Sequence, residues 1–109
     1  FTPNETITTA VSHAIKDTAR QNIIHIGFDM NKNIIKHIKN GILYATIIQD
    51  PYTMGYDGVK IIDQAIRGES NQKNIFTDYT LVTKDKLKQI KIINMIKSYN
   101  IDVTGMNKN

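Results

Sequence analysis

The run Ile23-Ile24-His25-Ile26-Gly27-Phe28-Asp29 is the most informative part of this 109-residue chain. It is short, rich in β-branched residues and does not alternate with polar ones, which is typical of a parallel strand covered on both faces. The run Leu43–Ile48 has the same character. Asp29 ends the first run and Gln49 ends the second, so we expect two parallel strands that each stop at a polar residue.

Helical patterns lie between and around these strands. The first spans Glu5 to about Arg20, with Asn4 or Thr2 as its cap and an apolar face made of Ile7, Ala10, Val11, Ala14 and Ile15. Three more are expected: Asn33 to Asn40, with Ile34, Ile35 and Ile38 inward and Gly41 closing it; Thr53 to Arg67, with Met54, Val59, Ile62, Ala65 and Ile66 on one stripe; and Asp85 to Tyr99, capped by Asp85 and carrying Leu87, Ile90, Ile93 and Ile96. A third strand is expected around Thr80 to Val82, and the polar tail from Asn100 to Asn109 is expected to fray.

The alternation of helices and strands predicts an α/β fold with a parallel sheet and right-handed crossovers. Three strands make a thin sheet, and its two apolar faces need more than four helices to cover them. We therefore expect the chain to be incomplete as a folding unit.

Charge and residue types exclude several functions. The net charge of +4 comes from twelve Lys and only two Arg, and the lysines are scattered along helix faces, so no nucleic-acid partner is expected. No Cys is present, no His pair has metal-ligand spacing, and neither a catalytic triad nor a glycine-rich phosphate loop is found. We expect no catalytic residue, no cofactor and no metal site. His25 is interpreted as a buried packing histidine, and His13 and His37 as exposed.

Three polar residues are candidates for a ligand site. In open α/β sheets, ligands bind at the carboxyl ends of the strands, where Asp29 and Gln49 lie. Asn4 would share that edge if a strand preceded Phe1. One carboxylate and two amides suit adjacent sugar hydroxyls, which donate and accept hydrogen bonds at once. The alternative is structural: Asn4 as a helix cap, Asp29 as a turn residue and Gln49 without a role.

A resemblance favours the ligand site. The stretch from Asn31 through Asp50-Pro51-Tyr52-Thr53-Met54-Gly55-Tyr56-Asp57-Gly58-Val59 resembles type I periplasmic sugar-binding proteins, in particular the ribose-binding cluster. The segment Ile24–Asp29 is similar to that family's strand ending in Gly-Phe-Asp, and Phe1–Glu5 is similar to its Asn-Asp/Glu turn. The match runs from Phe1 to about Lys86, and by resemblance the family's sugar contacts fall on Asn4, Asp29 and Gln49.

The resemblance also implies a domain organisation. Family members have two flavodoxin-like lobes, each a parallel sheet flanked by helices, and they trap sugar by hinge closure. The chain would be a C-terminal fragment of such a two-lobed protein. Residues 1–49 would belong to the C-terminal sugar-binding lobe, residues 50–77 would form a hinge crossover and a helix that packs on the absent N-terminal lobe, and residues 78–109 would return a strand to the C-terminal lobe and add a C-terminal helix and tail. That helix and tail extend beyond the shorter ribose-binding members.

The implied function is the binding of a monosaccharide, not an enzymatic reaction. A pentose such as ribose or xylose is favoured, in a periplasmic or cell-surface protein, with or without a lipid anchor. The expected partners are an ABC permease or a membrane sensor such as a histidine kinase or chemoreceptor. Two alternatives stay open: the effector-binding domain of a lactose-repressor-type transcription factor, and a half-protein that folds alone as a flavodoxin-like module.

Overall fold

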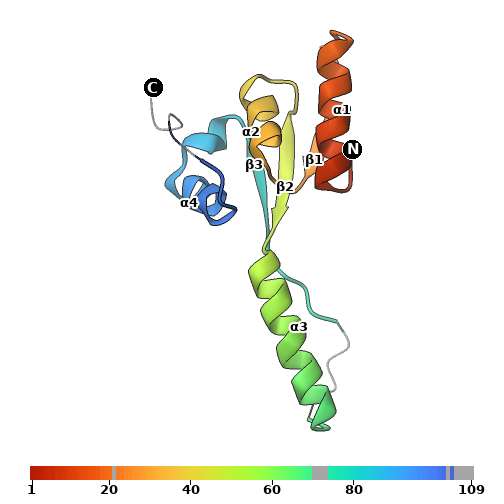
Figure 1. The fold of residues 1–109 in the computed structure, drawn as a ribbon, viewed down its shortest axis with the longest axis vertical. Helices are drawn as coiled ribbons and strands as arrows, with labels where there is room; N and C mark the ends of the chain where they lie inside the picture. Colours follow the sequence, from red (N-terminus) through yellow and green to blue (C-terminus); the bar gives the residue numbers. More distant parts are fainter. Residues whose placement is uncertain (21, 70–73, 103, 105–109) are drawn as a thin grey trace. The chain divides into compact units, whose positions relative to one another are not determined.

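The computed structural model describes residues 1–20, 22–69, 74–102 and 104. Its elements, labelled in Figure 1, are α1 (Glu5–Asp17), β1 (Ile26–Phe28), α2 (Lys32–Lys39), β2 (Ala45–Gln49), α3 (Pro51–Ile66), β3 (Tyr79–Thr83), the 3₁₀ helix η1 (Asp85–Lys88) and α4 (Ile90–Ser98). The chain divides into two compact units, a larger one of Phe1–Ile48 with Leu81–Asn109, and a smaller one of Gln49–Thr80.

The three strands form one sheet in the order β1-β2-β3. β1 and β2 pair in parallel, with Ile26 opposite Ala45 and Phe28 opposite Ile47, which confirms the predicted parallel pair. β1 is shorter than predicted and begins at Ile26; Ile24, which the prediction placed in the strand, lies outside it and is 75% exposed.

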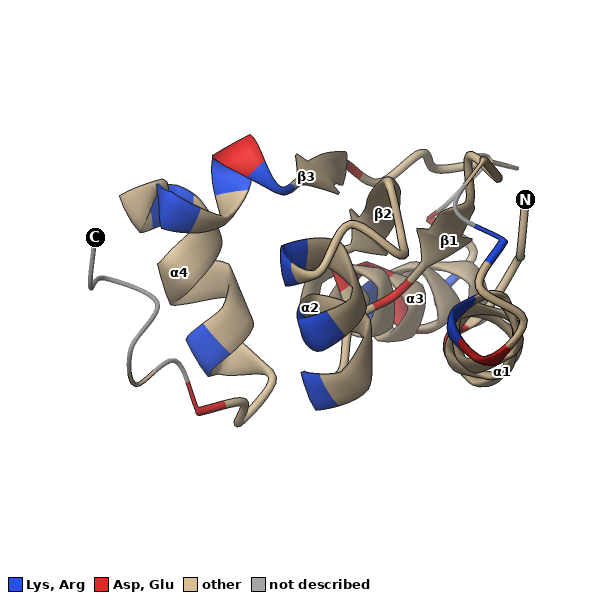
Figure 2. Ribbon diagram, turned by 90° about the horizontal axis from the view of Figure 1, so that it is seen from above, with Lys and Arg blue, Asp and Glu red and all other residues tan. Residues whose placement is uncertain are grey.

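The helices of the larger unit cover one face of the sheet. Figure 2 shows α1, α2 and α4 on the same side of the strands. Thr46, Ile48 and Val82 are buried, whereas Phe28 and Ile47 are only half-buried. The two-sided apolar strands that the sequence predicts are therefore covered on one side only by the helices of this unit.

The apolar core lies between α2, the strands and the C-terminal segment. Its buried members are Met30, Ile34, Ile35, Ile38, Leu43, Ile48, Val82, Leu87, Ile92, Ile96 and Ile101. The inward face predicted for α2 is confirmed, and Gly41 follows that helix with φ +75, the left-handed conformation that a glycine after a helix end commonly adopts.

The face that α1 buries matches the predicted one only in part. Thr8, Ser12 and Ile15 are buried, while Ile7 is 43% exposed and Ala10 and Ala14 are exposed. The prediction followed apolar residues, but this helix also packs through hydroxyl groups. The Thr8 hydroxyl accepts from the Phe28 N–H of β1, and the Ser12 hydroxyl contacts the buried imidazole of His25. His25 is buried and hydrogen-bonded, as expected.

The predicted C-terminal helix is divided into two parts. A 3₁₀ turn ends at Lys88, and α4 starts at Ile90 after an extended residue, Gln89, which makes no side-chain capping bond. Asp85 is therefore not the cap of α4. Ile90 is 77% exposed, whereas Ile92 is buried in the core.

The expectation of a fraying tail is wrong for Ile101, which is 8% exposed and joins the apolar core. Residues 103 and 105–109 of that tail lie outside the described residues.

The smaller unit contains α3, which begins earlier than predicted. Asp50 caps it by accepting a hydrogen bond from the Thr53 N–H at 3.0 Å, and Pro51 occupies the first turn, where no N–H partner is needed. No residue of α3 is buried. Of the predicted stripe, the large side chains of Met54, Val59, Ile62 and Ile66 are 43%, 71%, 62% and 80% exposed.

Candidate functional site

Asn4 lies at the N-terminus of α1 and caps it. Its Oδ1 accepts a hydrogen bond from the Ile7 N–H at 3.0 Å, so the structural interpretation of this residue is correct. The cap uses only Oδ1, and the Nδ2 donors take no part in it. The Asn4 carbonyl oxygen accepts two further bonds from Thr8, one from its N–H at 2.9 Å and one from its Oγ1–H at 2.7 Å.

Asp29 follows β1 directly and has a left-handed backbone, with φ 65. Its N–H donates to the Ile47 carbonyl oxygen at 2.8 Å, and its own carbonyl oxygen accepts from the Thr46 hydroxyl at 2.8 Å. A non-glycine residue in such a conformation costs on the order of 1–3 kcal/mol, less for Asp than for most residues, and it persists where the surroundings impose it. Two bonds to β2 impose it here.

One threonine connects these two residues. The buried Thr8 hydroxyl, which donates to the Asn4 carbonyl oxygen, also accepts a hydrogen bond from the Phe28 N–H at 3.1 Å. The structure therefore brings Asn4 and Asp29 to the same edge of the larger unit, at the carboxyl end of β1. Gln49 is the last residue of β2 and the first residue of the smaller unit.

A fourth residue at this edge, Asn31, was missed by the sequence analysis. Its Oδ1 caps α2 by accepting from the Ile34 N–H at 2.8 Å. Its Nδ2 donates to Glu5 Oε1 at 2.8 Å and to the Thr9 hydroxyl at 3.1 Å, which ties the N-terminus of α2 to α1. Only the helix-capping preference of Asn could have predicted the first contact from the sequence, since the other two partners are distant along the chain.

Asp50 is occupied by its capping role. Its carboxylate accepts from the N–H of Thr53 and, at 2.7 Å, from the hydroxyl of the same residue. These hydrogen bonds to Thr53 favour the charged form and hold the pKa of Asp50 below its usual value.

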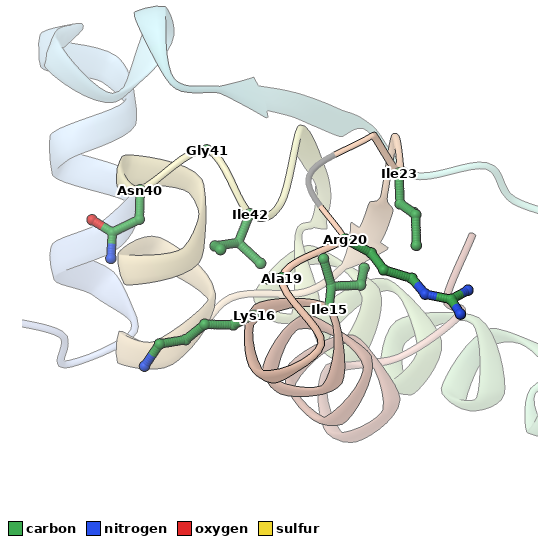
Figure 3. Close-up of a pocket in the computed structure, with 8 residues that line it drawn as sticks. All are labelled: Ile15, Lys16, Ala19, Arg20, Ile23, Asn40, Gly41 and Ile42. Atoms are coloured by element: carbon green, nitrogen blue, oxygen red, sulfur yellow. The ribbon is translucent and has the colours of Figure 1, made fainter.

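Two cavities of the larger unit lie away from the candidate site residues. One, of about 430 Å³, is lined by Ile15, Lys16, Ala19, Arg20, Ile23, Asn40, Gly41 and Ile42 (Figure 3). It lies beside the segments that precede β1 and β2, whereas Asp29 and Gln49 lie where these strands end. The other, of about 310 Å³, lies between α2 and Ile101-Asp102.

His37 corrects a sequence prediction, because it is only 4% exposed. Its ring lies edge to face with that of the exposed His13, with centroids 4.8 Å apart, and its buried Nδ1 has no hydrogen-bond partner. Burial lowers the pKa of His37, and the positive charges of His13, Lys16 and Lys36 lower it further. The prediction failed because Ile34 and Ile38 are buried in the core and His37 lies on the same side of α2.

Within residues 1–20, 22–69, 74–102 and 104, no group of three or more His, Cys, Asp or Glu side chains could hold a metal ion. In the same residues, none of the helices combines the length and the apolar character that crossing a bilayer requires.

Comparison with known proteins identifies the family. Residues 1–70 match the model of the periplasmic binding protein domain. The ribose import binding protein RbsB of Salmonella typhimurium is 31% identical over 84 residues, which cover 77% of this chain and 28% of that protein. The chain thus spans less than a third of the length of this relative.

Solved structures show the same likeness. A carbohydrate transporter solute-binding protein from Agrobacterium radiobacter in complex with D-arabinose is 33% identical, with a TM-score of 0.73 over 86% of this chain and 32% of that one. The XylFII–LytSN complex matches with 28% identity and a TM-score of 0.62 over 76% of this chain and 29% of that one. From the family match, the relatives and the parallel α/β sheet, we conclude that the chain belongs to the type I periplasmic sugar-binding protein family.

Proposed function

We propose that the chain is the C-terminal part of a two-lobed, extracytoplasmic protein that binds a pentose such as ribose or xylose and catalyses no reaction. The observation that carries this proposal is the placement of Asp29. Its strained backbone is held by two hydrogen bonds to β2, beside the capped N-terminus that carries Asn4. A carboxylate carried by a backbone that is fixed at a strand end can accept two sugar hydroxyl protons with less loss of entropy on binding than a carboxylate on a mobile loop.

The ligand contacts are proposed as Asn4, Asp29 and Gln49. The Nδ2 donors of Asn4 lie outside the capping bond, and Gln49 ends the strand that pairs with β1. Pentoses are favoured because RbsB is a ribose import binding protein and because a similar solute-binding protein was solved with D-arabinose.

We propose the domain organisation that the sequence resemblance implies. Residues 1–49 belong to the sugar-binding C-terminal lobe, residues 50–77 cross the hinge and pack their helix on the N-terminal lobe, and residues 78–109 return to the C-terminal lobe. Two observations support this: α3 buries none of its residues in this chain, and the chain covers 28% of the length of its RbsB relative. A 16-residue amphipathic helix such as α3 that packs its apolar face against nothing is unusual in a folded protein.

Two kinds of partner are proposed for the loaded protein, an ABC permease or a membrane sensor kinase. The import role in the name of RbsB supports the first, and the complex of XylFII with LytSN supports a protein partner. The effector domain of a lactose-repressor-type factor is less favoured, because the relatives at 31% and 33% identity are binding proteins of transport systems.

Isothermal titration of the two-lobed protein with D-ribose, D-xylose, D-arabinose and D-glucose tests the proposal. We expect saturable binding of at least one pentose at a ratio of one to one. Sulfate and phosphate serve as controls for non-specific binding. No heat with any of these sugars, from a protein that melts cooperatively, contradicts the proposed function.

A further inference from the structure

We propose that His25 is a positioning residue for the sugar site: as the neutral Nε2–H tautomer it completes a buried chain of hydrogen bonds that holds the backbone of Asn4 and Asp29 in place. The inference rests on the proposed function, which it deepens by naming what controls the site. His25 itself lies behind the site and is not proposed to contact the ligand.

The chain of hydrogen bonds joins α1, β1 and the N-terminal segment. His25 Nε2 lies 2.8 Å from the Thr2 hydroxyl, and His25 Nδ1 lies 3.3 Å from the Ser12 hydroxyl. The Thr2 hydroxyl lies 2.9 Å from that of Thr8. All four residues are buried, with exposed fractions of 2% for His25, 5% for Thr2 and 0% for Thr8 and Ser12.

The direction of each bond follows from the number of protons available. The Thr8 hydroxyl donates its only proton to the Asn4 carbonyl oxygen at 2.7 Å, so it must accept from the Thr2 hydroxyl. The Ile26 carbonyl oxygen, 3.5 Å away, is a second and more distant acceptor for the Thr2 proton. With either acceptor, the Thr2 hydroxyl has only a lone pair for His25. His25 Nε2 must then carry a proton and donate it, which leaves Nδ1 to accept from the Ser12 hydroxyl. Each bond is satisfied in one tautomer only.

The backbone positions of Asn4 and Asp29 both depend on Thr8, which ends this series of hydrogen bonds. Thr8 holds the Asn4 carbonyl oxygen on one side and receives the Phe28 N–H at 3.1 Å on the other. Phe28 immediately precedes Asp29, whose own N–H and carbonyl oxygen are fixed to β2. The backbone of Thr2 adds a bond from its N–H to the Ile26 carbonyl oxygen at 3.0 Å. Loss of the His25 bond frees Thr2 and, through Thr8, loosens both sides of the site.

Protonation of His25 disfavours the arrangement. The imidazolium still donates from Nε2 to Thr2, but its Nδ1 becomes a donor, so the Ser12 hydroxyl must turn to accept, and a charge is placed where water is excluded. Burial is the main cause that lowers the pKa of His25, and the imidazole of His37 acts in the same direction. It is positive when charged and cannot stabilise the imidazolium of His25.

Two variants separate positioning from general packing. His25→Gln keeps an amide donor for Thr2 but cannot titrate, whereas His25→Leu removes the donor. His37→Leu is the matched control, since it removes another buried imidazole that has no hydrogen bond to the chain of Thr2, Thr8 and Ser12. The affinity of the two-lobed protein for the pentose that it binds best is measured from pH 8 to pH 5, with circular dichroism confirming the fold at each pH.

We expect the affinity of the unaltered protein to fall by up to about tenfold for each pH unit below the pKa of His25. His25→Gln retains affinity at neutral pH with a flat profile, His25→Leu is weak at every pH, and His37→Leu keeps the pH dependence. A His25→Gln protein with an unchanged pH profile overturns the inference, as does a His25→Leu protein that binds as tightly as the unaltered one.

Nitrogen-15 NMR of the imidazole rings tests the inference without sugar. We expect neutral His25 to be protonated at Nε2, and the amide signals of Thr8, Phe28 and Asp29 to follow its titration. An Nδ1–H tautomer, or amide signals that ignore the titration, overturns the inference. If no sugar binds at any pH, the proposed function fails, and this spectrum alone then decides whether His25 holds the strand end in place.

Discussion

The side chain of Thr8 lies where a side chain at position 27 would begin. An ideal Cβ on Gly27 would be 2.8 Å from the hydroxyl oxygen of Thr8 and 3.1 Å from the Cβ of Thr8. The first distance is too short for a real Cβ, and the second requires the neighbouring atoms to shift. The absence of a side chain at Gly27 is therefore what lets α1 approach β1 closely enough for the Thr8 hydroxyl to reach the Phe28 N–H. The geometry of the candidate site depends on this contact.

Replacing Gly27 with Ala should push α1 away from β1. We expect Gly27→Ala to lower the free energy of unfolding by about 1–3 kcal/mol, the range for overpacked interiors. Urea unfolding followed by circular dichroism measures the change. The double variant Gly27→Ala with Thr8→Ala should lose less than the sum of the two single changes, because Thr8→Ala removes side-chain atoms with which the added methyl group clashes. Strictly additive losses contradict the proposed contact.

Acid should destabilise the larger unit. His25 and His37 both have a pKa lowered from the ordinary value of 6.5, mainly by burial. The unfolded chain then binds protons more readily than the folded one, so stability is complete above about pH 6.5 and is lost as the pH falls from there to the folded pKa. Urea unfolding between pH 8 and pH 5 tests this. A free energy of unfolding that stays constant or rises toward pH 5 contradicts it.

The same histidines differ in one respect. The Nδ1 of His37 is buried without a partner, which costs about 1–3 kcal/mol for a polar group. We expect His37→Leu to stabilise the protein at neutral pH by about 1 kcal/mol and to weaken its acid sensitivity. Thermal unfolding compared with His13→Leu, a change at the exposed partner ring, is the measurement. Destabilisation by His37→Leu at neutral pH would show that the imidazole is satisfied.

The N-termini of α1 and α2 are linked through Asn31, which makes three side-chain hydrogen bonds. Asn31→Ala removes the cap of α2 and both contacts to α1, and we expect it to cost about 1–2 kcal/mol of stability. Asn31→Asp keeps an acceptor for the Ile34 N–H but places a negative charge beside Glu5, so it should recover only part of the loss. The partial recovery should become larger in Glu5→Gln; equal recovery with and without Glu5 contradicts the direct contact.

Substitutions at two glycines of α3 test whether another part of the protein packs on this helix. Nothing lies within 4 Å of an added Cβ at Gly55 or Gly58, so in this chain the Ala variants should gain up to about 1 kcal/mol each from helix propensity. If α3 packs on an N-terminal lobe as proposed, the same changes should be neutral or destabilising in the two-lobed protein. A gain of equal size in both proteins contradicts the proposed packing.

The sequence predicted much of this fold because its strands and α2 follow apolar patterns. The apolar runs that form β1 and β2, the inward face of α2 and the cap at Asn4 are all local properties of a few consecutive residues. The face of α1 was predicted correctly at Ile15 but missed the buried Thr8 and Ser12, because an apolar pattern cannot reveal a helix that packs through hydroxyl groups.

The candidate site was predictable only in part for a similar reason. Asp29 could be located at a strand end, but its left-handed backbone depends on Thr46 and Ile47 across the sheet. Likewise, the contacts of Asn31 with Glu5 and Thr9 join residues that are distant in sequence. Such contacts are products of the folded chain and leave no local signal.

The most direct test of the central claim is a pentose titration of the two-lobed protein and its Asp29→Asn variant. Asn tolerates the left-handed backbone and keeps the shape of the side chain, so only the charge and its acceptor capacity are lost. We predict an unchanged melting temperature and a loss of affinity of about tenfold or more, as for a charge-assisted bond. If Asp29→Asn binds the pentose as tightly as the unaltered protein, Asp29 is not a sugar contact and the proposed site is wrong.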